Sequence, residues 1–537
     1  MINLRKSNLE RIQNQSFDVL IIGGGINGAV TAAALTARGV RVALIEKQDF
    51  AGFTSQESSN LVWGGIKYME TMEFGLVRNL CMSRNHLMRS YPSTVKEIRF
   101  YVNLEKGFRW PRLMLYMGSL LYWLIGNFFT KAPRLLSKKT IQREEPIVNT
   151  AKSMGGFEYS DCHLHDNDAR FVFNFIRSAL DHGGIITNYV ESRGSRREGA
   201  GWITKAKDVL TGQEFEIRSK MLINACGPYV DFQNKESSVT TVHRHLFSKG
   251  IHLMVNRVSK ADRVLTFFAD DGRLFFVIPM GPRSCVGTTD TRVEDLPAHV
   301  TAEDRKFVLD NINHRLLFQE PIQEKDIIAE RCGVRPLVVN PKTSSKDKGD
   351  WTSLSRKHAI EFNREIGHIS IFGGKLTDCL NIGEEITEMV KEYKITLPSE
   401  KARWYGEPSA DVREEFFHQA KLMDLDGMTA PESSEVLSAR LWRRYGTGGF
   451  GILEHIRENP SMSEVLIKGT EYIRGEIYLA ARREMIVKLE DFLRRRSKIA
   501  LIEKPETIRS APGLLEACRI LFGDQAEARL TEYFQSV

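Results

Sequence analysis

The amino-acid sequence predicts a mixed α/β protein with a parallel sheet, a second sheet that is antiparallel, and a helical C-terminal region. Residues 17–50 follow the pattern strand, glycine-rich turn, helix, strand, which is typical of a parallel βαβ unit. Residues 245–330 contain several short apolar stretches that resemble antiparallel strands. Beyond about residue 397 the composition becomes charged and helix-forming. These three regions define the expected fold class.

Composition excludes several classes of protein. With 537 residues, of which 42% are hydrophobic and 27% charged, the chain is globular and long enough for two to four domains. A net charge of +7 is small for this length, so it does not indicate nucleic-acid binding, although it suits an anionic substrate or an acidic membrane surface. The seven cysteines are widely spaced without a C-x-x-C pair, so neither a disulfide framework nor a metal site is expected.

We expect no secretory signal in the N-terminal region, because the first sixteen residues are mostly polar and include Glu10. We therefore expect a cytoplasmic protein. Residues 17–22 then lead into a glycine motif. Within this stretch, Val19 to Ile22 are expected to form a buried strand.

The motif G-x-G-x-x-G comprises Gly23, Gly25 and Gly28. Gly23 permits a tight turn, Gly25 lets a diphosphate approach the backbone, and Gly28 lets the following helix pack on the strand. The diphosphate would lie at the helix N-terminus, beside Ile26 and Asn27. The segment thus predicts a dinucleotide site.

The helix Ala29 to Arg38 is rich in alanine, and Gly39 ends it before the second strand, Val40 to Ile45. Glu46 closes that strand, where a carboxylate accepts hydrogen bonds from a ribose. A carboxylate here favours FAD or NAD over NADP.

FAD is preferred to NAD because of the segment that follows. The stretch 47–59 is rich in hydroxyl groups and precedes the glycine pair Gly64 and Gly65, which a minimal NAD half-domain does not need. The residues expected to contact the cofactor here are Lys47, Thr54, Ser55, Ser58, Ser59, Gly64 and Gly65.

The most hydrophobic stretch, Leu113 to Phe129, is shorter than the ~20 residues that a spanning helix needs. We expect a buried helix. The alternative is an interfacial segment, since Tyr122 and Trp123 are flanked by Arg109, Arg112, Lys131 and Arg134.

Further elements complete the outline. Asp168 to His182 is expected to be a helix with Asp168 as its N-cap, followed by a strand at 185–189 and a hairpin at 202–218. A strand at 221–225 and another at 369–372 end in glycine turns. The second turn is not an ATP-binding loop, because Leu376 follows Lys375 where Ser or Thr is required.

In the C-terminal region, Ile486, Leu489 and Leu493 share one helical face. The arginines around them, among them Arg494 to Arg496, are expected to form a solvated or ion-paired face, with a membrane or subunit contact as the alternative.

Short segments in order along the chain resemble the FAD-dependent glycerol-3-phosphate dehydrogenases, a family within the D-amino-acid-oxidase-like flavoproteins. The matching segments are 17–50, TSQESSNLVWGGIKYME (54–70), FEYSDC (157–162), DAR (168–170), NACGPYV (224–230), KGIH (249–252), GTTD (287–290), GVRPL (333–337) and FGGKLT (372–377).

The resemblance implies a Rossmann-type FAD domain with a β-meander, an antiparallel substrate sheet and a helical C-terminal domain. It implies oxidation of sn-glycerol 3-phosphate to dihydroxyacetone phosphate, with electrons passed to a quinone, or to oxygen in the oxidases. It also implies peripheral contact with the inner face of the cytoplasmic membrane. A homodimer is a further possible partner arrangement, and nucleic acid is not expected.

Site residues follow from the matched motifs. Arg335 and Lys375 offer the cations that a phosphate dianion needs, and His252 is the titratable side chain available as a base. We assign these three as catalytic, and Trp63, Lys67, Tyr68, Arg335 and Lys375 as substrate-binding. The remaining cofactor contacts expected from the matches are Ala225, Gly227, Gly374, Lys375, Leu376 and Thr377.

Four departures from the family pattern concern the substrate. WGGIKYME replaces the usual HGGLRYLE, so Trp63 stands for a histidine and Lys67 for an arginine. Asn60 stands where lysine is usual, and Asp378-Cys379-Leu380 replaces Thr-Tyr-Arg. Three alternatives therefore stay open: a different phosphorylated alcohol, a flavin-dependent amine or amino-acid oxidase, and a flavin-binding protein without turnover.

The expected domain division alternates along the chain. The cofactor domain takes 17–105, 151–240 and 331–396, a helical insertion takes 106–150, the antiparallel substrate domain takes 241–330, and the helical C-terminal domain takes 397–537.

Overall fold

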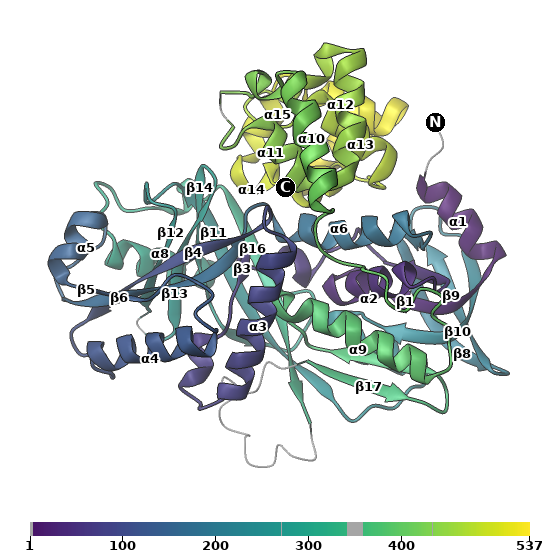
Figure 1. Cartoon of the computed structure of the whole chain (residues 1–537), viewed down its shortest axis with the longest axis horizontal. Helices are drawn as coiled ribbons and strands as arrows, with labels where there is room; N and C mark the ends of the chain where they lie inside the picture. Colours follow the sequence, from purple (N-terminus) through teal and green to yellow (C-terminus); the bar gives the residue numbers. More distant parts are fainter. Residues whose placement is uncertain (1–3, 270, 341–357, 432) are drawn as a thin grey trace.

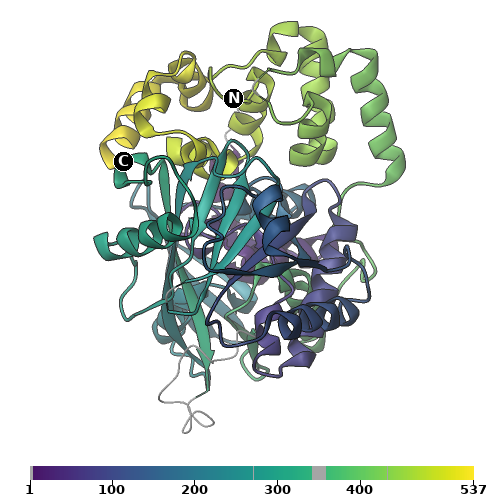
Figure 2. The same ribbon diagram turned by 90° about the vertical axis from the view of Figure 1, so that its left-hand side faces the viewer.

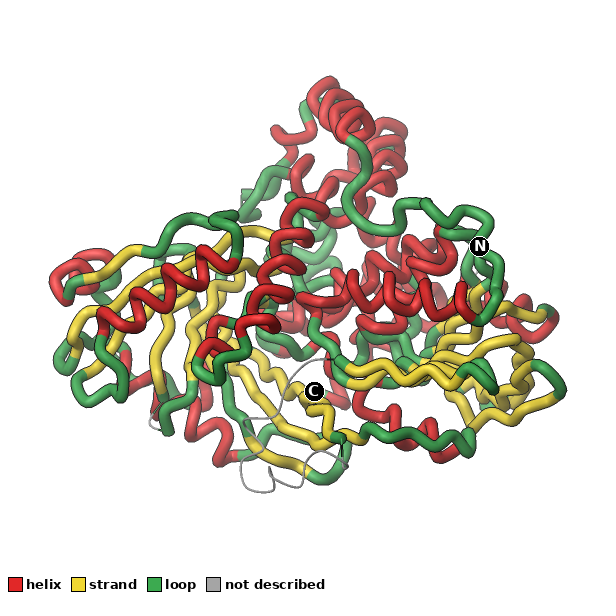
Figure 3. The backbone as a smooth tube through the Cα atoms, turned by 60° about the horizontal axis from the view of Figure 1, so that its bottom comes forward, coloured by secondary structure: helices red, strands yellow, loops and turns green. Residues whose placement is uncertain are grey.

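The computed structural model describes residues 4–269, 271–340, 358–431 and 433–537. Two sheets lie side by side and the C-terminal helices form a separate layer against them (Figures 1 and 2). Figure 3 shows the strands gathered in two regions of the molecule with helices between them. The predicted mixed α/β class is confirmed.

The first sheet has the strand order β17-β18-β10-β1-β2-β7. Strands β18, β10, β1, β2 and β7 run parallel to one another, and β17 is an antiparallel edge strand. Strands β8 and β9 extend β10 as an antiparallel meander, which confirms the predicted hairpin. The strands are β1 (Ser16–Ile22), β2 (Val42–Ile45), β7 (Ile185–Thr187), β8 (Val190–Glu198), β9 (Gly201–Asp208), β10 (Glu214–Asn224), β17 (Ala359–Asn363) and β18 (His368–Phe372).

Strand β1 is buried on both faces, as its apolar run predicts. Val19 and Ile21 pack against the alanine-rich helix α2, whereas Leu20 and Ile22 face the meander and α1. The helices around this sheet are α1 (Leu4–Asn14), α2 (Ile26–Ala37), α6 (Asp168–Asp181), α7 (Val230–Glu236) and α9 (Cys379–Glu392).

The N-cap of α6 differs from the prediction. Asn167, and not Asp168, caps this helix by accepting a hydrogen bond from the Arg170 N–H at 2.6 Å. Asp168 instead accepts from the Ser58 N–H at 2.8 Å. Both residue types are good caps, so the sequence could not separate two neighbouring candidates.

The second sheet has the order β15-β11-β14-β13-β12-β4-β6-β3, with β16 on β11 and β5 on β6. All its pairs are antiparallel except β12 with β4. The strands are β3 (Leu61–Val62), β4 (Val95–Glu105), β5 (Arg134–Leu136), β6 (Ser153–Leu164), β11 (Arg244–Asn256), β12 (Arg263–Phe268), β13 (Leu274–Met280), β14 (Arg283–Gly287), β15 (Thr291–Val293) and β16 (Ala329–Val339).

This sheet draws on more of the chain than residues 241–330. Strands β4, β6 and β16 fall in ranges that we assigned to the cofactor domain, yet they pair within the second sheet. The alternation of apolar residues identifies a strand but not its partner. The domain division therefore stays a prediction. Residues 341–357, which belong to the last predicted range of the cofactor domain (331–396), lie outside the described residues.

Helix α4 (Arg112–Ile125) corrects one expectation. Of its residues only Ser119 and Tyr122 are buried, whereas Leu113 is 62% and Met117 56% exposed. The prediction of a buried helix is wrong, because one face of α4 packs on the sheet and the other faces outward. No helix in the described part of the chain is long and apolar enough to span a bilayer.

The C-terminal region is helical, as predicted, with two apolar clusters of its own. Its helices are α10 (Ala410–Leu422), α11 (Leu437–Tyr445), α12 (Gly449–Glu458), α13 (Arg474–Arg483), α14 (Ile499–Ile502), α15 (Pro505–Ser510), α16 (Leu514–Phe522) and α17 (Ala526–Ser536). The remaining helices are α3 (Phe74–Ser90), α5 (Lys138–Glu144) and α8 (Ala302–Arg315).

The predicted arginine-rich face is ion-paired, but much of it is buried. Residues Asp491–Arg496 form a single π-helical turn. Arg495 and Arg496 are nearly inaccessible and pair with Asp49 of the first sheet's domain. The arginines therefore hold the helical layer to the rest of the molecule.

Candidate cofactor and substrate site

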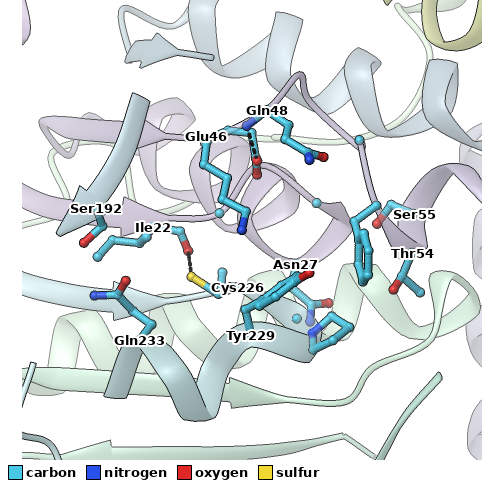
Figure 4. Close-up of a pocket in the computed structure, with 18 of the residues that line it drawn as sticks. Ile22, Asn27, Glu46, Gln48, Thr54, Ser55, Ser192, Cys226, Tyr229 and Gln233 are labelled. Carbon is cyan, nitrogen blue, oxygen red and sulfur yellow. Dashed lines mark hydrogen bonds between the residues drawn. The ribbon is translucent and has the colours of Figure 1, made fainter. Parts of the chain in front are cut away.

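A cleft of about 270 Å³ opens at the carboxyl ends of β1, β2 and β10 (Figure 4). In a parallel sheet this edge is the usual place for a ligand. Eleven residues predicted to contact a cofactor line it: Gly23, Gly25, Ile26, Asn27, Glu46, Lys47, Thr54, Ser55, Ala225, Gly227 and Gly374.

The three motif glycines allow different close approaches. Gly23 has φ +109°, and a Cβ on it would lie 2.6 Å from the Ala225 carbonyl oxygen. A Cβ on Gly28 would lie 1.9 Å from the Gly23 carbonyl oxygen. Gly28 thus stands behind the cleft and lets α2 pack on β1, while Gly25 lines the cleft as the N-cap of α2.

The N-terminus of α2 faces the cleft. Its N-cap residue is Gly25, so no side chain of that residue caps the first N–H groups of the helix. The Ile26 N–H donates to the Ser55 hydroxyl at 3.0 Å. A helix N-terminus concentrates positive potential and N–H donors, which suits a diphosphate.

Asn27 provides a second observation that points to a ligand. Its side-chain N–H donates to the Gly373 carbonyl oxygen at 3.0 Å, but its Oδ1 is buried and has no hydrogen-bond partner within the described residues. Buried polar atoms are rarely left unpaired. An acceptor in this position fits a hydroxyl-bearing ligand beside the phosphate site.

Glu46 is fixed at the other end of the cleft. Its carboxylate accepts from the Gly24 N–H at 2.7 Å and from the Gln48 N–H at 2.8 Å. Burial raises the pKa of Glu46, although these two N–H groups oppose the shift. The remaining lone pairs can accept the hydroxyls of a ribose.

Several predicted cofactor residues lie outside the cleft lining. Ser58 donates its N–H to Asp168, and Gly64 donates its N–H to Asp161 at 3.1 Å. The Thr377 hydroxyl donates to the Trp63 carbonyl oxygen at 3.4 Å, which joins the turn at 63–65 to the turn at 373–377. The predicted residues outside the lining are Gly28, Ser58, Ser59, Gly64, Gly65, Lys375, Leu376 and Thr377.

The predicted substrate residues fall into two groups. In the first, Lys375 Nζ lies 2.8 Å from the Tyr68 hydroxyl and 4.2 Å from the Tyr68 ring centroid. The Trp63 ring lies 6.2 Å from that of Tyr68. Lys67, which follows on the 3₁₀ turn Ile66–Met69, is exposed.

In the second group, Arg335 lies across Gly250 toward His252. A Cβ on Gly250 would meet the Arg335 guanidinium at 2.0 Å, so only glycine leaves room for it. The guanidinium donates to the Thr288 hydroxyl at 3.0 Å and lies 3.3 Å from Asp290. The chain neighbours Pro336 and Gly374 both line the cleft, whereas Arg335 and Lys375 themselves are not part of its lining.

His252 is 4% exposed on β11, opposite Gly287. Burial lowers its pKa to about 3, and the cations Arg335 and Arg331 add to the shift. Its Nδ1 has no hydrogen-bond partner in the described part of the chain. The imidazole is therefore neutral at physiological pH and able to accept a proton.

Two positioning residues escaped the sequence analysis. His245 Nε2 accepts from the Gly373 N–H at 3.1 Å, and burial lowers the pKa of His245 to about 4. Behind Gly64, Asp161 forms a buried ion pair with Arg84 at 2.6 Å. These contacts join segments far apart in the chain, although Asp161 lies in the matched segment FEYSDC.

Part of the cleft lining was also missed. Tyr229 and Gln233 follow the turn at Gly227, and the Lys47 ammonium lies 4.2 Å over the Tyr229 ring. Ser192 comes from the meander strand β8. The NACGPYV segment pointed to Ala225 and Gly227, but no local signal singled out Ser192.

Comparison with protein families matches residues 18–348 to the FAD dependent oxidoreductases and residues 403–527 to the C-terminal domain of alpha-glycerophosphate oxidase. Curated relatives include the aerobic glycerol-3-phosphate dehydrogenases of Staphylococcus haemolyticus, 29% identical over 505 residues, and Staphylococcus aureus, 28% identical. Each alignment covers 91% of this chain and 88% of the relative.

Solved structures share the fold. A glycerol-3-phosphate dehydrogenase from Bacillus halodurans complexed with FAD has a TM-score of 0.74 and 22% identity, and the match covers 100% of this chain and 97% of that one. An L-alpha-glycerophosphate oxidase from Mycoplasma pneumoniae with FAD bound has a TM-score of 0.54 and 18% identity, covering 73% and 98%. The predicted architecture is thereby confirmed.

Proposed function

The chain belongs to the family of FAD-dependent oxidoreductases, and from this premise we propose that it oxidises sn-glycerol 3-phosphate, or a close phosphorylated polyol, to dihydroxyacetone phosphate. The relatives that match over most of its length are aerobic glycerol-3-phosphate dehydrogenases. The observation that carries the proposal is that two cations adjoin residues of the cofactor cleft in sequence, Arg335 next to Pro336 and Lys375 next to Gly374.

The cofactor fits the residues present. Gly25 and the N-terminus of α2 would hold the diphosphate, Glu46 the ribose, and the unpaired Asn27 Oδ1 a hydroxyl of the ligand. When bound, FAD supplies the two-electron acceptor for the hydride lost by the alcohol carbon. The protein contributes the orientation of the substrate and the path of the proton.

Arg335 and Lys375 would bind the phosphate dianion. The Arg335 guanidinium is aimed by Thr288 and by Asp290, and Gly250 leaves the space in which it lies. Lys375 is held against Tyr68. A planar fork and a point charge together suit a phosphate ester.

We propose that His252 receives the proton of the substrate hydroxyl. Its pKa of about 3 makes it a weak base in the free protein. A phosphate dianion against Arg335 would offset one of the charges that lower this pKa. Substrate binding would therefore raise the pKa of His252 and make it a stronger base.

The departures from the family pattern differ in their bearing on substrate choice. Asn60 is buried and bonds the Asp166 carbonyl oxygen at 2.7 Å, and Asp378 pairs with His358 at 3.0 Å. Both have packing partners. Lys67 is exposed, whereas the half-buried Trp63 has its ring 6.2 Å from that of Tyr68, so Trp63 is the departure expected to tune the substrate.

The electron acceptor and the cellular location form a further part of the proposal. We propose a membrane quinone as electron acceptor, reached by peripheral contact at the inner face of the cytoplasmic membrane, and a homodimer as a possible assembly. Oxygen is the competing acceptor. The ratio of oxygen consumption to reduction of a soluble quinone analogue separates the two.

An anaerobic spectral titration tests the reaction. We expect the flavin absorbance of the purified protein to bleach with sn-glycerol 3-phosphate and not with glycine or proline. Bleaching by amines alone would favour an amine or amino-acid oxidase. A yellow protein that no phosphorylated alcohol or amine reduces would be a flavin-binding protein without turnover. A phosphorylated polyol other than glycerol 3-phosphate as best reductant would implicate Trp63.

A further inference from the structure

Helix α4 presents an apolar surface to the outside of the molecule. The side chains of this surface are between 39% and 62% exposed. We call them the α4 apolar surface, and they are Trp110, Leu113, Met114, Met117, Leu121, Leu124 and Phe128. An α-helix turns once in 3.6 residues, so the five members within α4 lie within an arc of about 100°. A contiguous patch of this kind marks an interaction site on a soluble domain.

The opposite face of α4 accounts for its attachment. Ser119 and Tyr122 are buried, and the Tyr122 hydroxyl bonds the Asp161 carboxylate at 2.9 Å. Asp161 in turn accepts from the Gly64 N–H in the turn beside Trp63. The helix is thus anchored firmly on one side, directly behind a turn of the candidate site, while its apolar side has no cover in the described chain.

The charge around α4 favours one kind of partner. Between Lys106 and Arg143 the sequence contains eight Lys and Arg residues and no Asp or Glu. Arg109 pairs with Glu70 and Arg134 with Glu144, but Lys106 and Lys131, one beyond each end of α4, are exposed. Such a segment complements an anionic surface.

The distribution of side chains fits a lipid leaflet better than a second copy of the chain. Leu and Met occupy the middle of the surface, whereas Trp110 and Phe128 lie at its ends. Aromatic and basic groups around an aliphatic centre are the pattern of a helix lying in a membrane interface. Two copies meeting here would bring their basic segments together, which is unfavourable.

We propose that the α4 apolar surface lies in the headgroup region of a membrane rich in anionic phospholipids. The inference extends the proposed peripheral contact by assigning it to one helix. Helix α3 contacts α4, and Met72 and Phe74, before and at the start of α3, are 71% and 37% exposed. The C-terminal helices lie on the opposite side of the molecule (Figures 1 and 2), so they would face away from the lipid.

Co-sedimentation of the flavin-loaded full chain with vesicles tests this assignment. The vesicles contain equal parts phosphatidylcholine and phosphatidylglycerol, with pure phosphatidylcholine as comparison. The test variant is Leu113→Gln, Met117→Gln and Leu121→Gln combined. The matched control, Val209→Gln, Leu317→Gln and Leu422→Gln combined, removes three exposed apolar side chains elsewhere.

We expect the test variant to lose at least about tenfold in partitioning, the control to bind as the parent does, and Lys106→Gln with Lys131→Gln to weaken binding only to the anionic vesicles. Unchanged binding of the test variant, or no binding by the parent, would overturn the proposal. So would a test variant that dissociates a parent oligomer in size exclusion, because the surface would then join two copies.

Turnover of sn-glycerol 3-phosphate with a water-soluble dye is measured in parallel. Equal dye turnover in all variants is expected, because none of these residues touches the candidate site. Vesicle binding without dye turnover would count against the proposed function alone, and dye turnover without α4-dependent binding would count against the lipid surface alone.

Discussion

Arg496 of the C-terminal region donates two hydrogen bonds to Asp49, at 2.7 and 2.8 Å. Asp49 follows Glu46 and Gln48, which line the cofactor cleft, and Arg495 and Asn188 also donate to it at 2.8 and 2.9 Å. Burial raises the pKa of Asp49, but Arg496 and Arg495 outweigh burial and hold the pKa below its usual value. The helical layer thereby fixes the loop that carries Glu46, the carboxylate proposed to bind the ribose.

Substituting Arg496→Met should weaken FAD binding and lower the free energy of unfolding by roughly 3 kcal/mol, because it leaves a buried carboxylate short of a partner. Urea unfolding and fluorimetric FAD titration measure the two effects. The exposed pair Arg41–Asp18 offers a control, since Arg41→Met should cost less than about 1 kcal/mol. Equal effects of the two substitutions would show that Arg496 does not hold the loop.

Gly28→Ala should prevent cofactor binding, because the added Cβ would lie 1.9 Å from the Gly23 carbonyl oxygen. The flavin content of the purified protein reports the loss. Gly451→Ala in α12 is the matched control, since nothing lies within 4 Å of a Cβ there, and alanine should raise stability by roughly 0.5–1 kcal/mol in a helix. A yellow Gly28→Ala protein with parental flavin affinity would contradict the predicted packing.

His252→Gln should slow flavin reduction by sn-glycerol 3-phosphate by roughly 10²–10⁴-fold, if the imidazole accepts the hydroxyl proton. Stopped-flow reduction measures this step, and the exposed His418→Gln serves as control. An unchanged reduction rate would exclude His252 as the base.

The same substitution should change the acid side of the stability curve. The pKa of His252 is about 3 in the folded protein, against the usual 6.5, so the unfolded chain binds more protons between these values. Its contribution to stability is complete above pH 6.5 and is lost as the pH falls toward 3. His252→Gln should therefore reduce the loss of stability between pH 6.5 and 4, which unfolding at several pH values measures.

His358 and Asp378 should give the opposite dependence. Burial lowers the pKa of His358, but Asp378 and Glu385 outweigh burial and raise it to about 9. The stabilisation is complete below pH 6.5 and is lost as the pH rises through about 9. His358→Gln should remove this alkaline loss, seen as a flatter melting temperature between pH 7 and 10. His182→Gln, which is exposed, should retain it.

Arg335→Lys should raise KM for sn-glycerol 3-phosphate by roughly tenfold or more, because lysine loses the bidentate fork. Flavin content should stay at the parental level, since Arg335 is not part of the cleft lining. Steady-state kinetics with a soluble dye acceptor measure KM, and the surface change Lys421→Met should leave it unaltered. A lower kcat with unchanged KM would place Arg335 outside the phosphate site.

The parts of the site that depend on local geometry were predictable from sequence. Gly28 is required by a close backbone approach within one βαβ unit, Gly23 by the positive φ of the turn that it forms, and Glu46 by the end of its strand. His245 and Asp161 act across long sequence separations, so no local pattern marks them. The burial of α4 was predicted wrongly, because an apolar stretch alone does not indicate which residues cover it.

The partners of the strands were likewise beyond a single sequence. The alternation in β11 to β14 indicated antiparallel strands correctly, but it could not show that β4 and β6 join them. Strand β12 pairs with β4 across more than 150 residues of chain, and such pairing is decided by packing of both partners.

The order in which the cleft is completed has a consequence for biosynthesis. Its lining runs from Ile22 to Gly374, and the arginine that steadies the Glu46 loop is residue 496. A ribosome-bound chain therefore lacks a complete nucleotide-binding site until most of the protein has been translated. Flavin incorporation should be a late event, and truncated translation products should emerge colourless.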